Sequence, residues 1–454
     1  MKKLTTGNIL LFFCSTSSFL STPLQALSTL KMSTPKHIVV VGGGVQGSSV
    51  AYFLSKHYGS NVNTKQEVKV TVLESQSIAS AASGKGGGFM ARSWGDGGST
   101  QQLHHLAFDL YEELAPQLGC TTYRKLPVLS VQPGKGGVTK AQKSNKMKSY
   151  MPGWLDGNIG GASVMGRGDD TAQITPREFT NKLLEACSDS VSVVYGTATG
   201  VETNDNDVVT GVRYTEAGGK CKGKDMNSGG DASESSSSVM ECDALVVSAG
   251  PWSCAAEDWF EGLKLPMEGV KSTSIVFQSD DQVDATALFC GEDYRFGTHL
   301  EVYPRPDGTI YLCGIGGSEY ITTQELKAGA YRDECNANPT RVQAASDSFR
   351  EMSASFRSSC SGPDVTQACM RPCPPDALPY MGSIPGYEGA YINAGHNCWG
   401  IAWAPACGKA MAELVLDGES SSVDLSPFDP SRFSAKLSGG RGRKKKGSSV
   451  GEQW

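Results

Sequence analysis

The fold is decided by one stretch near the start of the chain, His37-Ile38-Val39-Val40-Val41-Gly42-Gly43-Gly44-Val45-Gln46-Gly47. Its apolar run predicts a buried strand, and the glycines after it predict a tight turn into a helix. Gly42 permits the turn, Gly44 lets the backbone approach a phosphate, and Gly47 lets the helix pack against the strand. The amides that open the helix, those of Val45 and Gln46 among them, then face an anion. The stretch therefore predicts a site for the pyrophosphate of a dinucleotide.

The residues that follow support this interpretation. An amphipathic stretch from Ser49 to His57 predicts the helix, and a second strand, Val68–Leu73, ends on Glu74. An acidic residue at this place hydrogen-bonds a ribose hydroxyl in dinucleotide sites, although a polar loop over 59–66 makes the spacing longer than usual. An ordinary glycine turn before a helix is the alternative.

Length, charge and cysteine content limit the class of protein. The 454 residues suffice for two domains, and a formal net charge of −6 argues against nucleic-acid binding as the main activity. The basic run at 441–446 is interpreted as part of a solvated tail. The 14 cysteines are scattered without zinc spacing, Cys369 and Cys373 included, so we expect free thiols and no metal site.

The first 26 residues resemble a signal peptide or the front of an organelle-targeting sequence, with Lys2 and Lys3 before an apolar run. This run is too short, and too often interrupted by Ser and Thr, to span a membrane, and no other segment has transmembrane character. Met32 is a candidate alternative start that would yield a cytosolic product. The sequence therefore leaves a cytoplasmic and an organellar location open.

Further along the chain, patterning predicts more of the same α/β unit. A glycine-rich stretch, Ala82–Phe89, indicates close approach of backbone to a ligand or a strand, or alternatively a flexible loop. Helices are expected over Gln101–Leu118 and from the capping sequence Thr175-Pro176-Arg177-Glu178 to Cys187. Strands are expected at 191–195, 197–202, 208–214 and 243–252, with a disordered polar insertion at about 216–239.

From Gly269 onward the apolar period changes to two. It predicts strands at Thr273–Phe277, Leu300–Tyr303 and Thr309–Cys313, the last two joined by a turn at 306–308. A strand at Ala390–Asn393 and a helix over 405–416 then return to the first pattern. Because antiparallel β differs from the βαβ beginning, a second domain is expected.

Five landmarks stand in order along the chain: the Gly42–Gly47 turn with Glu74; Ser83–Gly87; Ile174–Glu178; Val246–Trp252; and a C-terminal block of Arg371-Pro372, 375–379, Gly395-His396, Gly400-Ile401 and 404–408. Together they resemble the superfamily of D-amino-acid oxidase, glycine oxidase and sarcosine oxidase, which are FAD enzymes. The resemblance extends from His37 to Gly418. The C-terminal block is most similar to glycine oxidase, and the whole looks like a poorly characterised eukaryotic branch.

This resemblance implies an α/β fold: a Rossmann-like FAD-binding domain and a second, α+β substrate domain built on an antiparallel sheet. The FAD-binding domain is expected to be discontinuous, over 36–110, 170–262 and 368–430, and the substrate domain to take 111–169 and 263–367. Residues 1–35 are expected as a targeting or disordered leader, and 431–454 as a disordered basic tail.

The same resemblance implies where FAD binds. The ADP part lies across the Gly42–Gly47 turn and Glu74. The flavin needs neighbours without bulk, because a flat ring packs against backbone. The positions that match the family's cofactor contacts there are Ser83, Gly84, Lys85, Gly86, Gly87, Ala249, Gly250, Gly395, His396, Gly400 and Ile401.

Enzymes of this superfamily oxidise a carbon–nitrogen bond. A hydride passes to flavin N5, the imine hydrolyses, and dioxygen reoxidises the flavin to give hydrogen peroxide. The expected partners are therefore a small amine or amino-acid-like substrate and dioxygen, with no nucleic acid. Arg371 matches the arginine that binds the substrate carboxylate in glycine oxidase, since its planar fork suits a carboxylate. A structural ion pair is the alternative role for Arg371.

Two positions depart from the glycine oxidase pattern. Cys398 stands where a second arginine is found, and Glu301 stands where a tyrosine contacts the carboxylate. Positive charge is thereby lost, so we expect a substrate other than a simple small amino acid, with Glu301 meeting an amine or another cation. A solvated strand glutamate is the alternative reading of Glu301.

Other features leave the activity partly open. Cys369 matches the cysteine that carries covalent flavin in monomeric sarcosine oxidase, and a small buried apolar residue is the alternative. That enzyme also uses a lysine to activate dioxygen, and Thr309–Glu319 contains none, so a dehydrogenase with another acceptor stays possible. An FAD-binding protein with a trafficking role and little turnover, and a tRNA-modifying oxidoreductase, are further alternatives.

Overall fold

The computed structural model describes residues 37–60, 68–134, 150–216, 237–279, 283–359 and 361–434. The predicted leader, most of the predicted insertion and most of the predicted tail lie outside these residues. The predicted end of the insertion and the predicted start of the tail are wrong. Ser237–Glu241 form strand β10, and Pro430–Phe433 form the 3₁₀ helix η5, whose Phe433 packs against a buried core. Both are short and polar, so they carry no apolar period that a sequence reading could use.

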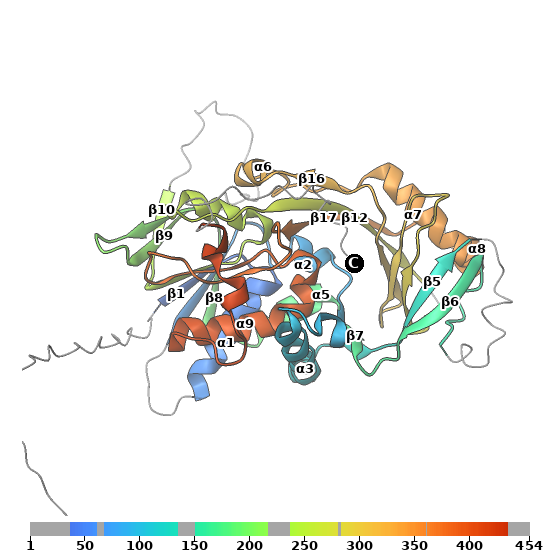
Figure 1. Ribbon diagram of the computed structural model, residues 1–454, viewed down its shortest axis with the longest axis horizontal. Helices are drawn as coiled ribbons and strands as arrows, with labels where there is room; N and C mark the ends of the chain where they lie inside the picture. Colours follow the sequence, from blue (N-terminus) through green and yellow to red (C-terminus); the bar gives the residue numbers. More distant parts are fainter. Residues whose placement is uncertain are drawn as a thin grey trace, which may run out of the picture. The chain divides into compact units, whose positions relative to one another are not determined.

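Strand β1 (His37–Val41) is buried on both faces, as its unbroken apolar run predicts. Ile38 and Val40 belong to a core shared with helices α1 (Val45–Ser60), α3 (Gln101–Gln117) and α9 (Gly400–Asp417). Val39 and Val41 belong to a second core on the opposite face. Figure 1 shows α1 and α9 side by side along this sheet. Burial of both faces is typical of a central parallel strand.

The first sheet contains a parallel centre in the order β8-β2-β1-β11-β19. Strands β9 (Val209–Glu216) and β10 extend it beyond β8, and β18 (Tyr380–Ser383) extends it beyond β19, all antiparallel. The chain runs outward from β1 through β2 and β8, then returns to β11 on the other side of β1. Ligands of such sheets bind outside the carboxyl ends of the strands where the order reverses. The bounds of the four further strands are β2 Lys69–Glu74, β8 Val191–Thr203, β11 Ala244–Val247 and β19 Ala390–Ala394.

The second sheet is antiparallel except where β13 pairs with β5, and its order is β16-β12-β15-β14-β13-β5-β6. Strand β17 (Val365–Cys373) pairs with the far side of β12 and places Cys369 opposite Ser272 and Arg371 opposite Val270. Figure 1 shows β17 and β12 running together. The mixed α/β class and the antiparallel second sheet are confirmed. The domain limits stay a prediction. The strands are β5 Val128–Pro133, β6 Ile159–Gly166, β12 Glu268–Gln278, β13 Ala287–Cys290, β14 Glu301–Pro304, β15 Thr309–Cys313 and β16 Glu319–Ile321.

Shorter elements complete the described chain. A three-stranded sheet joins β3, β7 and β4. None of the helices in the described ranges combines the length and the apolarity needed to cross a lipid bilayer. The bounds are α2 Ala82–Lys85, β3 Phe89–Ala91, η1 Ser93–Gly95, β4 Arg124–Lys125, β7 Thr171–Gln173, α5 Pro176–Glu185, η2 Gly250–Asp258, α6 Thr323–Lys327, α7 Pro339–Met352, α8 Ala354–Ser359, η3 Asn397–Trp399 and η4 Ser426–Phe428.

Two local predictions are wrong for identifiable reasons. Thr175 is the N-cap residue of α5, but its side chain makes no capping hydrogen bond, and the Glu178 carboxylate accepts from Thr121 and Thr122 instead of completing a capping box. Helix α9 begins at Gly400, before the predicted start at Pro405. Proline has no N–H to donate to the carbonyl four residues earlier. That carbonyl, of Ile401, accepts the Tyr111 hydroxyl at 2.6 Å, so the helix continues through the proline.

Candidate functional site

A cavity of about 710 Å³ lies between the two sheets. Its volume falls within the ~300–1,000 Å³ usual for small-molecule and cofactor sites. Residues that follow β1 and β11 line one end, and residues of β12, β14, β15 and β17 line the other. The cavity therefore begins where the order of the first sheet reverses.

The glycine turn after β1 has the close contacts that the sequence predicts. Gly42 has φ +107°, and a Cβ there would lie 2.4 Å from the carbonyl oxygen of Ser248, just after β11. A Cβ at Gly47 would lie 1.9 Å from the Gly42 oxygen, so Gly47 permits helix packing but does not itself line the cavity. The Val45 N–H donates to Ser83 Oγ at 2.9 Å. The first two landmarks of the sequence are thus in direct contact.

Glu74 is fixed at the rim of this turn. Gly43 N–H donates to its Oε2 at 2.7 Å, and Gln76 N–H donates to its Oε1 at 2.9 Å. The residue is buried and lines the cavity. Its carboxylate is therefore held at the end of β2 beside the glycine turn, the place predicted for a ribose contact.

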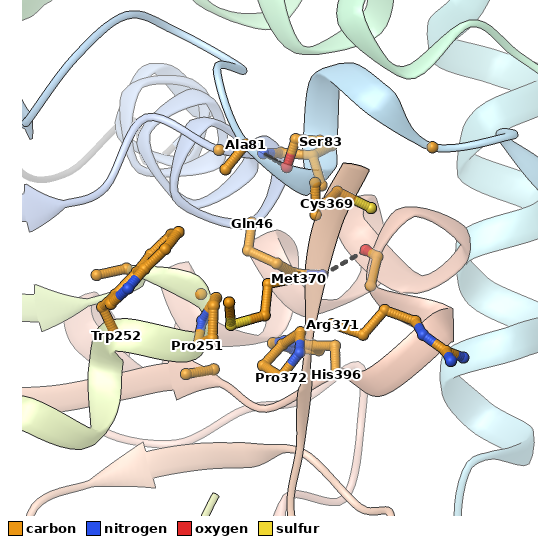
Figure 2. A pocket seen from close by; sticks show the side chains of 18 of the residues that line it. Gln46, Ala81, Ser83, Pro251, Trp252, Cys369, Met370, Arg371, Pro372 and His396 are labelled. Atoms are coloured by element: carbon orange, nitrogen blue, oxygen red, sulfur yellow. Dashed lines mark hydrogen bonds between the residues drawn. The ribbon is translucent and has the colours of Figure 1, made fainter. Parts of the chain in front are cut away.

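Gln46 joins the glycine turn to the C-terminal block. Its Nε2 donates to the Gly400 carbonyl at 2.6 Å, the contact drawn in Figure 2, and its Oε1 accepts from Asn393 Nδ2 at 3.1 Å. The sequence offers no local signal for these contacts, since they connect positions some 350 residues apart.

The glycine-rich segment after β2 contributes only some of its residues to the cavity. Ser83, Gly86 and Gly87 line it, whereas Gly84 and Lys85 do not. A Cβ at Gly84 would lie 1.9 Å from the Ala79 oxygen. Lys85 departs from the prediction of a flavin contact: its Nζ donates to the Ala368 carbonyl at 2.9 Å and its side chain faces a separate cavity of about 40 Å³.

The later landmarks also converge on the large cavity. Ala249 and Gly250 line it from the end of β11, and His396, Gly400 and Ile401 line it from the C-terminal block. Gly395 is not on its wall. With φ +78° and a Cβ position 2.7 Å from Pro374, Gly395 is needed for the turn that carries His396.

His396 is buried and uncharged. Burial lowers its pKa from 6.5 to about 3, and its Nε2 has no hydrogen-bond partner among the described residues. It therefore acts as a neutral side chain on the cavity wall at physiological pH.

This burial predicts a pH dependence of stability. Below pH 6.5 the unfolded chain binds a proton at His396 and the folded chain does not, until about pH 3. As the pH is lowered through this range, we expect His396 to reduce the free energy of unfolding of the ligand-free protein by about 1.4 kcal/mol for each pH unit. Urea titrations at several pH values should show that the free energy of unfolding of His396→Asn depends less steeply on pH than that of the wild type. Equal slopes for the two proteins would contradict the burial of an uncharged imidazole.

Several buried polar atoms on the cavity wall fit a long, polar ligand such as FAD. Ser248 Oγ, Asn393 Oδ1, His396 Nε2 and Arg371 Nε have no hydrogen-bond partner among the described residues. Buried polar groups are nearly always paired in folded proteins, so unpaired ones on a cavity wall indicate a ligand that pairs with them. The glycine turn supplies the backbone approach that a pyrophosphate needs.

Arg371 carries the positive charge at the other end of the cavity. In Figure 2, Cys369 and Arg371 leave β17 on one side and Met370 leaves it on the other. Among described residues the guanidinium makes a long hydrogen bond, 3.4 Å to Ser272 Oγ, and interacts with the Cys398 side chain, and no ion pair is found for it there. The described residues therefore offer no partner for the structural ion pair that is the alternative role of Arg371.

Glu301 lies on the same cavity wall and is buried, at 8 % exposed. The Tyr303 hydroxyl donates to its Oε2, and the Cys313 thiol donates to the same atom at 3.4 Å. Burial raises the pKa of Glu301, against the opposing effects of Tyr303, Cys313 and Arg371. The alternative of a solvated glutamate is wrong.

Aromatic side chains that the sequence reading missed line this end of the cavity. Phe89 stacks on Tyr303 at 5.5 Å between ring centroids, and Trp94 meets Phe289 edge-on at 5.2 Å. Tyr311 and Trp399 complete the group. The six residues come from separate elements, so no single period in the sequence could mark them.

Three cysteines face the same end, among them Cys313, whose thiol donates to Glu301. Cys369 and Cys398 line the cavity, and desolvation raises the pKa of each to about 11. Both are therefore thiols at neutral pH. No cluster of metal-ligating side chains occurs within the described ranges.

Comparison with known proteins shows which family the chain resembles. The model of the FAD dependent oxidoreductase family (DAO) matches residues 37–414. A protein of Schizosaccharomyces pombe, whose name assigns it to the oxidoreductases without a substrate, is 28% identical over 408 residues, covering 88% of this chain and 99% of its own. The glycine oxidase of Pseudomonas putida is 24% identical over 410 residues, covering 87% and 98%. The solved structure of glycine oxidase from Geobacillus kaustophilus superposes with a TM-score of 0.65 at 17% identity, covering 88% and 99%, which shows a shared fold.

Proposed function

The chain belongs to the FAD dependent oxidoreductase family, and from its cavity we propose that it oxidises a carbon–nitrogen bond of an amine or amino acid that also carries an anionic group. Bound FAD supplies the hydride acceptor for the carbon that bears the nitrogen, leaving an imine that water hydrolyses. The residues that would hold FAD are the Gly42–Gly47 turn and Glu74 at one end, and Ser83, Gly86, Ala249 and Gly400 further along.

The observation that carries this proposal is the pair of groups on one wall: an arginine that no carboxylate of the described residues pairs with, and a buried carboxyl group. Arg371 offers two N–H donors in a plane to a substrate carboxylate. Glu301 then receives the substrate ammonium. The aromatic side chains around it exclude water and hold the apolar part of the substrate. Positioning of this kind supplies most of what a hydride transfer needs from the protein.

Dioxygen is the electron acceptor that we propose, with hydrogen peroxide as its product. Support comes from relatives over most of the chain that are named oxidases. An oxidase should form hydrogen peroxide under air. A dehydrogenase should form little peroxide and should instead reduce an artificial dye in the absence of air.

The test is anaerobic mixing of the FAD-loaded protein with a panel of amines, amino acids and N-alkyl amino acids. We expect at least one amine with a carboxylate to bleach the flavin absorbance. A hydroxy acid of the same shape serves as the control and should leave the flavin oxidised. If no amine in a broad panel bleaches it, the proposal fails and a binding role gains support.

We also expect FAD to be bound without a covalent bond. An attacking thiolate is needed for attachment, and the pKa of Cys369 is raised to about 11 by desolvation. After acid precipitation the yellow colour should stay in the supernatant, for the wild type and for Cys369→Ala alike. Colour in the pellet that disappears in Cys369→Ala would show attachment at this residue.

A further inference from the structure

We infer that Glu301 accepts a proton from the substrate ammonium before the carbon–nitrogen bond is oxidised, and that Tyr303 positions the Glu301 carboxylate for this step. The inference rests on the proposed function and deepens it. It assigns a chemical step to a residue that the proposed function uses only for binding.

The hydrogen bonds of Glu301 leave one oxygen available. Tyr303 and Cys313 both donate to Oε2, and no described residue donates to Oε1. The side chain lies on the wall of the large cavity, on the same wall as Arg371. A substrate whose carboxylate binds Arg371 can therefore present its nitrogen to Oε1.

The chemistry requires such an acceptor. An ammonium nitrogen has no lone pair, and a lone pair must be free to form the carbon–nitrogen double bond as hydride leaves the carbon. In the proposed step one N–H bond breaks and an O–H bond forms on Oε1, while the nitrogen keeps the electron pair. Glu301 becomes a neutral acid and the substrate a neutral amine, so the step is balanced without a further reagent.

The surroundings favour a carboxylate that binds a proton readily. Burial raises the pKa of Glu301. The hydrogen bonds from Tyr303 and Cys313 oppose this rise, and so does the positive charge of Arg371. The thiols of Cys290 on β13 and Cys398 in η3 are the other titratable groups whose charge is coupled to Glu301. A substrate carboxylate on Arg371 neutralises a cation that favours the ionised form of Glu301. Binding therefore makes Glu301 a stronger base at the moment it is needed.

The experiment measures the rate of anaerobic flavin reduction against pH, with the best substrate of the amine panel. In the wild type we expect the rate to rise with pH as Glu301 ionises and then to level off. In Glu301→Gln the rate near neutral pH should fall by roughly 10²- to 10⁴-fold. The rate of this variant should keep rising with pH until the amine itself loses its proton.

Two further variants separate a chemical role from a structural one. Tyr303→Phe removes a donor that favours the ionised carboxylate, so the rising limb should move to higher pH. Glu268→Gln, an exposed glutamate on β12 of the same sheet, is the control and should keep the wild-type profile. An unchanged profile in Glu301→Gln with retained bleaching would overturn the inference and leave the proposed function intact. Absence of bleaching in the wild type would instead overturn the proposed function.

Discussion

Replacing Gly42 by alanine should yield a protein that retains little or no FAD. A Cβ at this position would lie 2.4 Å from the Ser248 carbonyl oxygen and 3.1 Å from Ala249 Cα, both backbone atoms of the neighbouring strand end. The residue also has φ +107°, a backbone conformation that residues with a side chain rarely adopt. Since β1 and β11 flank the point where the sheet order reverses, moving them apart deforms the pyrophosphate site itself. The ratio of flavin to protein absorbance after purification measures the effect.

Gly97→Ala is the matched control for this variant. Gly97 has φ +76°, yet a Cβ there would meet nothing within 4 Å. It therefore carries the backbone strain alone, about 1–2 kcal/mol, and should bind FAD as the wild type does. Circular dichroism shows whether Gly42→Ala is folded. A folded Gly42→Ala protein with a full complement of FAD would contradict the role given to this turn.

Replacing Arg371 by methionine should abolish most activity on substrates that carry a carboxylate. Loss of a charged hydrogen-bonding partner typically costs about 2 kcal/mol or more, equivalent to a rise of at least ~30-fold in the dissociation constant. Arg371→Lys keeps the charge but not the planar fork, so an intermediate loss is expected. Titration of the flavin spectrum with an unreactive carboxylate measures binding without turnover.

The same variant distinguishes binding from a structural role. Removing the buried guanidinium relieves its desolvation but also removes the charge that favours ionised Glu301, so the melting temperature should change little. A large fall in melting temperature, or unchanged affinity for carboxylates, would contradict the assignment. Amines without a carboxylate should react equally with the wild type and with Arg371→Met.

The sequence predicts the first sheet well because its signals are local. The run from His37 to Val41 must be buried on both faces, and the glycines after it have few other structural uses. The period of two after Gly269 likewise predicts the antiparallel strands β12, β14 and β15. Local patterning of this kind depends on neighbours a few residues away, which a single chain displays directly.

The substrate end could be predicted only in part, because it is assembled from distant elements. Family resemblance directs attention to Arg371 and Glu301, but the hydrogen bond from Tyr303 depends on side-chain packing. Lys85 belongs to a glycine-rich landmark, yet it turns toward the Ala368 carbonyl, a contact across 283 positions. The six aromatic side chains share no period and no segment, so only the folded chain brings them together.

A crystal structure of the FAD-loaded protein with an unreactive amino-acid analogue bound tests the placement of cofactor and substrate most directly. We expect the pyrophosphate at the Gly42–Gly47 turn, the flavin ring within the large cavity, and the analogue's carboxylate on Arg371 with its nitrogen beside Glu301. A flavin ring outside that cavity, or an analogue bound with neither Arg371 nor Glu301 in contact, would contradict this placement.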